Sequence, residues 1–143
     1  MRRALLDVNV LIALLDAAHQ HHRLAWEWLD ANIEFGWASC PLTQNGCIRI
    51  MSQPGYPNAL PATAVAERLA AATATNHHAF WPDAVSMLDA GRIAWNAVLG
   101  SRQVTDVYLL ALAVHHDGRL VTLDRAVPLK AVPGAKARHL AVI

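Results

Sequence analysis

Three aspartates occupy positions that a parallel β-sheet would bring to one edge. Asp7 follows one apolar segment, Asp124 ends a second, and Asp106 stands at the beginning of a third. A cluster of carboxylate oxygens without a neighbouring His or Cys suits a hard divalent cation such as Mg²⁺ or Mn²⁺. Sites of this kind usually hydrolyse phosphate esters, because the cation binds the phosphate, activates water and stabilises the leaving oxygen.

The elements that must position these acids follow from the hydrophobic pattern. Short apolar runs rich in branched residues alternate with longer segments of helical period, as in βαβ units around a parallel sheet. The expected strands are residues 3–6, 34–39, 78–81, 119–124 and 138–143. The expected helices are residues 9–17, 21–33, 41–53, 61–74, 85–91 and 105–118. The chain has no repeat, linker or low-complexity segment, so one α/β domain with a central parallel sheet flanked by helices is predicted.

Several of these elements carry signals at their ends. Asn9 is placed as the N-cap of the first helix and Thr105 as the cap of the last. Pro41 suits the first turn of the third helix. Gly91 and Gly118 are predicted to end the helices that precede them.

The predicted topology explains why an acid interrupts the apolar run of residues 5–15. Crossover helices run antiparallel to the strands, so the first turn of a helix lies at the same edge as the strands' carboxyl ends. If the first and fourth strands are neighbours, Asp7 and Asp124 start ~4.8 Å apart, at the crevice where open α/β sheets bind ligands. Asp7 is therefore expected to point into a polar pocket, where like charges favour a cation between them.

Each aspartate taken alone also has an ordinary structural explanation. Asp106 could stabilise its helix by interacting with the positive end of the helix dipole, and Asp124 could be a turn or cap residue. Only the convergence of all three at one edge favours a functional site.

Composition restricts the class of protein. The chain has 143 residues, of which 55% are hydrophobic and 16% charged, with a formal net charge of +1. The high hydrophobic and low charged fractions predict a surface that a partner covers. The net charge near zero does not indicate a polyanionic partner. An acid and an amide interrupt the first apolar run, and no run approaches the roughly 18–20 residues of a membrane span, so a cytoplasmic protein without a membrane role is expected.

The remaining chemically active residues have simple explanations. Cys40 and Cys47 are expected to be free cysteines of the core or near the surface. The histidines at 19–22, 77–78 and 115–116 lack the spacing of a zinc site. The five tryptophans could stack RNA bases, but Trp26 and Trp28 lie in an amphipathic helix and are explained more simply as core or dimer contacts. Most arginines are expected to be solvated, although five of them could still meet on one face: Arg49, Arg92, Arg102, Arg119 and Arg125.

Four segments, in order and spacing, resemble a known family. "LLDVNVLIALL", "PLTQNGCIRI", "TDVYLLALA" and "LVTLD" look like the PIN-domain ribonucleases, and in particular the VapC toxins of bacterial toxin-antitoxin modules. The resemblance implies a single PIN domain over residues 1–143 and an endoribonuclease that depends on Mg²⁺ or Mn²⁺. It also implies an RNA substrate, a homodimer and a small antitoxin protein that blocks the site.

The resemblance assigns roles by position. Asp7, Asp106 and Asp124 match the family's catalytic acids, with Asp7 and Asp106 as metal ligands. Asn9 and Thr122 match polar residues that often support these acids.

One position departs from the family pattern. Gln44 stands where the family usually has a glutamate, although the flanking Thr43 and Arg49 are in place. An amide carries no charge and cannot act as a base, so weaker metal binding is expected. An enzyme that works with three acids is favoured over a PIN-like binding module that has lost its chemistry.

Two further alternatives fit less well. A phosphatase of the haloacid dehalogenase type needs a second acid two residues after Asp7, where this chain has Asn9. A receiver domain needs an acidic pair beside the first strand and a lysine after the fifth, and neither is present.

Overall fold

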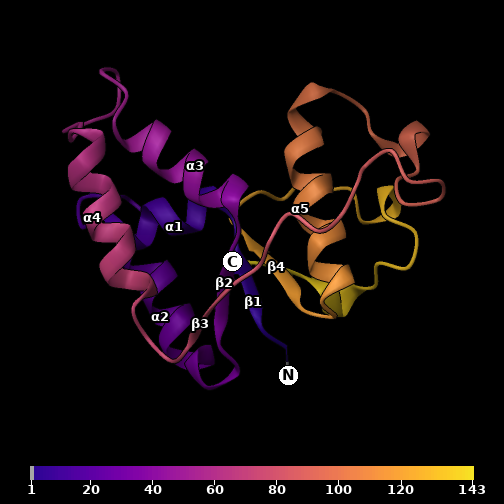
Figure 1. Cartoon of the computed structure of the whole chain (residues 1–143), viewed down its shortest axis with the longest axis horizontal. Helices are drawn as coiled ribbons and strands as arrows, with labels where there is room; N and C mark the ends of the chain where they lie inside the picture. Colours follow the sequence, from indigo (N-terminus) through magenta and orange to yellow (C-terminus); the bar gives the residue numbers. More distant parts are fainter. Residues whose placement is uncertain (1) are drawn as a thin grey trace.

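The computed structural model describes residues 2–143, and its centre is a five-stranded parallel sheet (Figure 1). The strand order is β3-β2-β1-β4-β5. The strands are β1 (Ala4–Leu6), β2 (Trp37–Ser39), β3 (His78–Phe80), β4 (Arg119–Thr122) and β5 (Leu140–Val142). The helices are α1 (Val8–Leu15), α2 (His22–Asn32), α3 (Pro41–Met51), α4 (Ala62–Thr73) and α5 (Val104–His115). The α/β prediction is therefore confirmed.

Helices cover both faces of the sheet. Figure 1 shows α1 to α4 on one side of the strands and α5 with the later loops on the other. Side chains of a strand alternate between the two faces: Leu5 of β1 belongs to the core beneath α5, whereas Ala4 and Leu6 belong to the core beneath α1 to α4. Burial on both faces explains why the strands are continuous apolar runs.

The first helix begins one residue after Asp7 and is capped by it, so the prediction of Asn9 as N-cap was wrong. Asp7 has extended backbone angles, and one of its carboxylate oxygens accepts a 2.7 Å hydrogen bond from the N–H of Val8. A side chain that satisfies a free N–H of the first turn defines the helix start. Asn9 lies inside that turn, and the helix ends at Leu15 with Asp16 as its C-cap.

The third helix packs closely on the first. Pro41 occupies its first turn as predicted. A Cβ atom on Gly46 would lie 2.8 Å from Cγ2 of Val8, closer than side chains pack. Only glycine therefore allows α3 to approach the beginning of α1 this closely.

Three other predicted boundaries were wrong. Residues 85–91 form turns and no helix, because this segment does not bury one helical face: Val85 is buried but Leu88 is 89% exposed. Residues 34–36 lie in a 3₁₀ turn and a glycine bend, so β2 begins at Trp37. Thr105 lies inside α5, which is preceded by the 3₁₀ turn Ser101–Gln103 and has Gln103 as its N-cap residue.

The predicted end of the last helix at Gly118 was wrong, whereas the cysteines agree with prediction. The helix ends at His115 with His116 as its C-cap residue, and Asp117 then adopts a left-handed conformation before Gly118 and β4. Cys40 and Cys47 are free and buried. No helix within residues 2–143 has both the length and the apolar character that crossing a membrane requires.

Candidate functional site

The predicted site lies where β1 and β4 run side by side. Leu6 of β1 is in register with Val121 of β4, and the N–H of Asp7 donates to the carbonyl of Val121 over 2.9 Å. The sheet grows toward β2 on one side of β1 and toward β4 on the other. This reversal of strand order creates the crevice at which open α/β sheets bind ligands.

Asp7 is more enclosed than the sequence predicted. Its residue is only 5% exposed, so it lies at the edge of the core and does not project into an open pocket. One carboxylate oxygen accepts from Val8, and the other accepts a 2.7 Å hydrogen bond from the hydroxyl of Thr122. Burial raises the pKa of Asp7 above its ordinary value, although both hydrogen bonds oppose that shift. These two donors explain how a carboxylate is tolerated in an apolar run.

Thr122 connects the polar groups at this edge. Its fully buried hydroxyl donates to Asp7, accepts from the N–H of Asp124 over 3.0 Å, and lies 3.4 Å from the amide nitrogen of Asn9. The amide oxygen of Asn9 in turn accepts from the N–H of Leu123. Asn9 and Thr122 therefore hold the beginning of α1 against the end of β4, beside Asp7 and Asp124.

Asp106 completes the acidic cluster from the first turn of α5. Burial, followed by the negative charges of Asp7 and Asp124, raises the pKa of Asp106 to about 7. The carboxyl of Asp124 also comes within hydrogen-bonding reach of it. All three predicted acids thus lie close enough to repel one another, although they come from three different elements.

The donors at this edge fit a hard divalent cation. They are carboxylate oxygens without His or Cys, and their mutual repulsion is the electrostatic situation that a bound cation relieves. Within residues 2–143, no three His, Cys, Asp or Glu side chains are grouped so that together they could hold a metal ion. Mg²⁺ commonly keeps several waters and binds through only one or two carboxylates, so an open cluster suits it.

The remaining predicted site residues, Thr43, Gln44 and Arg49, belong to α3. The Gln44 amide nitrogen donates to the hydroxyl of Ser39 over 3.0 Å, and that hydroxyl lies 2.8 Å from Nε2 of His78. Burial, assisted by the charge of Arg3, lowers the pKa of His78. The position of Ser39 at the end of a buried strand was a signal for this contact that the sequence analysis missed.

Thr43 and Arg49 have different surroundings. The buried hydroxyl of Thr43 accepts from the N–H of Cys40 over 3.0 Å and donates to the carbonyl of the same residue, so it stabilises the beginning of α3. Arg49 is exposed in the last turn of α3, about 7.5 Å further along the helix axis than Gln44.

Arg92, Arg102 and Arg119 line three different pockets. Of these, only Arg102 lines the same groove as one of the three aspartates, Asp124.

Of the two tryptophans of α2, Trp28 packs against the core and Trp26 is exposed. Trp26 is 49% exposed and donates from its ring nitrogen to the carbonyl of Leu14. Trp28 is partly buried, and its ring lies 4.8 Å from the guanidinium carbon of Arg119.

Comparisons with known proteins agree with this geometry. The family model described as PIN domain matches residues 4–134. Ribonuclease VapC44 of Mycobacterium tuberculosis (strain ATCC 25618 / H37Rv) is 52% identical over 141 residues, which are 99% of either chain. Ribonuclease VapC29 of the same strain is 47% identical over 84% of either chain. Ribonuclease VapC39 is 44% identical over 92% of this chain and 95% of its own.

Proposed function

The chain belongs to the PIN domain family, and we propose that it is the toxin of a type II toxin-antitoxin system, a Mg²⁺- or Mn²⁺-dependent endoribonuclease built as one PIN domain over residues 1–143. The observation that carries this proposal is the convergence of Asp7, Asp106 and Asp124 at the β1–β4 edge, where burial, followed by the charges of the other two acids, raises the pKa of Asp106 to about 7. The ribonuclease names of relatives that cover nearly the whole chain support the choice of RNA.

Each acid has a distinct role in the proposal. Asp7 and Asp106 hold the cation, and Asp124 completes the negative site beside them. When bound, the cation supplies an activated water and neutralises charge on the phosphate. The hydroxyl of Thr122 donates to the Asp7 carboxylate and keeps it oriented. Two hydrogen bonds hold Asp124: its N–H donates to the hydroxyl of Thr122, and its carboxylate accepts from the N–H of Ala126. None of the three acids needs to act as a nucleophile. Water would attack the phosphorus and the bond from phosphorus to the 3′-oxygen would break, so we expect products with a 5′-phosphate and a 3′-hydroxyl.

Metal binding can be measured without any substrate. Calorimetric titration of the protein with MnCl₂ or MgCl₂ should show binding that Asp7→Asn weakens strongly, because the variant loses a charge at the cluster. Asp30→Asn is the matched control, since Asp30 is exposed on α2. Equal affinity in Asp7→Asn and wild type would contradict the assignment of Asp7 as a ligand.

A growth assay tests the toxic role. Expression of the wild type alone should arrest growth, and Asp7→Ala or Asp106→Ala should relieve the arrest, while Asp30→Ala should not. In the purified state, wild type with Mg²⁺ or Mn²⁺ should cut RNA, and a chelator should stop the reaction. Toxicity that is equal in wild type and both active-site variants would mean that cleavage is not its cause.

The partners of a toxin are part of the proposal. An apolar groove of about 180 Å³ runs along α1, α2 and α4, and the exposed Trp26 lies at it. This groove and the low charge of the chain support an antitoxin that covers apolar surface and closes access to the acids. We also expect a homodimer, and action in the cytoplasm, where RNA is available.

A binding module without catalysis is the second candidate. The contact of Gln44 with Ser39 favours it, because that amide is occupied at the end of β2 and supplies no fourth charge. RNA binding without cleavage, in the presence of either cation, would support this candidate against the enzyme.

A further inference from the structure

Asp124 opens onto a groove of about 560 Å³ at the beginning of α5, lined by Asp124, Ala126 and residues 99–103. Its volume lies in the range of sites that enclose small ligands, roughly 300–1,000 Å³. The groove therefore offers room for part of a nucleotide chain directly beside the acidic cluster.

Gln103 holds the two walls of this groove together. Its side-chain oxygen accepts from the N–H of Leu99 over 2.8 Å, and its amide nitrogen donates to the carbonyl of Ala126 over 3.2 Å. The loop before α5 is thereby tied to the loop after β4. The groove is thus shaped before any ligand enters it, which lowers the ordering cost of binding.

Arg102 is the one basic residue among those that line the groove. It is exposed, and within residues 2–143 its side chain makes no hydrogen bond and no ion pair. Other arginines are engaged: Arg2 pairs with Asp117 and Arg23 pairs with Glu27. The guanidinium of Arg102 is therefore free to bind an anion from outside the chain.

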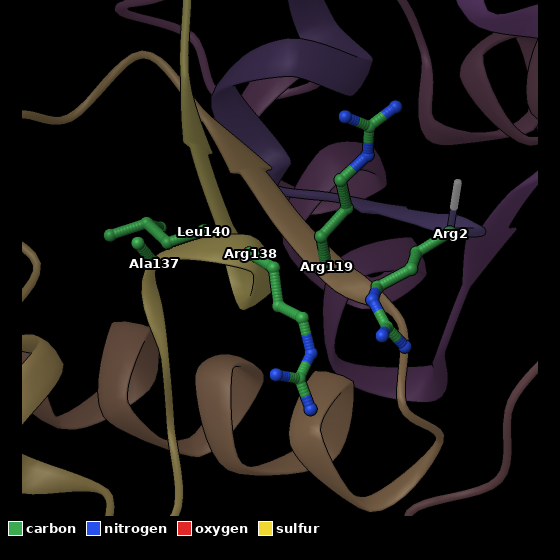
Figure 2. Close-up of a pocket in the computed structure, with 5 residues that line it drawn as sticks. All are labelled: Arg2, Arg119, Ala137, Arg138 and Leu140. Carbon is green, nitrogen blue, oxygen red and sulfur yellow. The ribbon is translucent and has the colours of Figure 1, made fainter.

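The larger basic pocket elsewhere on the molecule does not offer the same opportunity. It encloses about 630 Å³ and is lined by Arg2, Arg119 and Arg138 (Figure 2). In Figure 2 the guanidinium of Arg119 points away from those of Arg2 and Arg138. Arg119 donates to the side chain of Asn32, and Asp117 partly neutralises the other two arginines. This pocket has no convergent free cation.

We propose that Arg102 binds a backbone phosphate of the RNA next to the bond that is cut, and so positions the substrate in the groove beside Asp124. This inference rests on the proposed function. A phosphodiester that approaches three carboxylates is repelled by them, so a fixed positive charge on the groove wall is needed in addition to the cation. The planar guanidinium can donate two parallel hydrogen bonds to the oxygens of one phosphate.

The kinetic test separates positioning from chemistry. Arg102→Ala should raise the KM for a short RNA about tenfold while kcat stays within twofold. Arg102→Lys should recover only part of the loss, because it keeps the charge but not the two parallel donors. Arg23→Ala is the matched control, because it removes an exposed arginine of α2, far along the chain from the groove. Arg102 is exposed, so unchanged thermal unfolding of Arg102→Ala should show that the fold is intact.

The salt dependence of RNA binding would change if Arg102 contacts a phosphate, but not if Arg102 only supports the fold. In the Asp7→Asn background, the slope of log Kd for single-stranded RNA against log salt should fall by about 0.7 on adding Arg102→Ala, as one phosphate contact is lost. If wild type cuts RNA while Arg102→Ala leaves both KM and this slope unchanged, the inference is overturned and the proposed function stands. If wild type neither cuts nor binds RNA, both are overturned.

Discussion

Replacement of Asp106 by asparagine should stabilise the protein when no divalent cation is bound. Burial and the charges of Asp7 and Asp124 raise the pKa of Asp106 from 3.8 to about 7. A raised pKa means that the folded state holds the proton more tightly than the unfolded state, so ionised Asp106 costs stability. That cost grows as the pH rises above 3.8 and is complete above pH 7. Asparagine cannot ionise and avoids it.

The magnitude follows from the size of the pKa change. One pKa unit corresponds to 1.36 kcal/mol, and the pKa of Asp106 changes by about three units. The upper limit on the cost of ionised Asp106 at pH 8 is therefore roughly 4 kcal/mol. Asp106 is only half-buried and solvent screens part of the repulsion, so about half of this limit, or ~2 kcal/mol, is the realistic value. At pH 5 most of the carboxyl is protonated in the folded state, and the cost falls below ~1 kcal/mol.

Urea unfolding in the presence of a chelator measures this difference. Asp106→Asn should exceed wild type in free energy of unfolding by ~2 kcal/mol at pH 8 and by less than half of that at pH 5. Excess Mg²⁺ should reverse the order, because ligand binding to the folded state stabilises wild type more than the variant.

The control is Asp30→Asn, whose effect should be small and equal at both pH values, since Asp30 is exposed on α2. A stability difference for Asp106→Asn that does not change between pH 5 and pH 8 would refute the reasoning. Asp106 would then not be the carboxyl that the neighbouring acids hold protonated.

Three further substitutions test the supporting structure. Thr122→Val should lower the free energy of unfolding in urea by roughly 1–3 kcal/mol, because buried Asp7 loses its hydroxyl donor. Thr122→Ser keeps a hydroxyl and should lose less stability. Equal stability of Thr122→Val and wild type would contradict this prediction. Gly46→Ala should lower the free energy of unfolding, because the new Cβ would meet the stiff side chain of Val8. This clash should outweigh the gain of about 1 kcal/mol that alanine has over glycine in helix propensity. Gly55→Ala is the control and should be neutral, since its Cβ would meet no atom. Gln44→Glu should tighten Mn²⁺ binding in calorimetry by adding a charge, and an unchanged affinity would show that residue 44 does not face the cation.

Much of the fold could be predicted because helices and strands leave different periods in the sequence. All five predicted strands are present, and each α-helix of the structure was expected within a few residues. The prediction failed at residues 85–91, where Val85 and Leu88 look like one apolar face but only Val85 finds a core to pack against. The predicted start of α1 was wrong for a related reason. Asp7 and Asn9 are both good capping residues, and Asp7 became the N-cap because β1 ends directly before it.

The sequence by itself determined that three acids would meet at one edge. In a parallel α/β chain the strand ends and the first turns of the following helices share that edge, so Asp7, Asp106 and Asp124 could be placed from their positions alone. Only the tertiary structure decided how enclosed Asp7 is, because its second hydrogen-bond donor, Thr122, is 115 residues away in the chain. Likewise, the groove that joins Arg102 to Asp124 exists because two loops distant in sequence are tied together by Gln103. Contacts of this kind depend on which strands are neighbours, and no local pattern of residues encodes them.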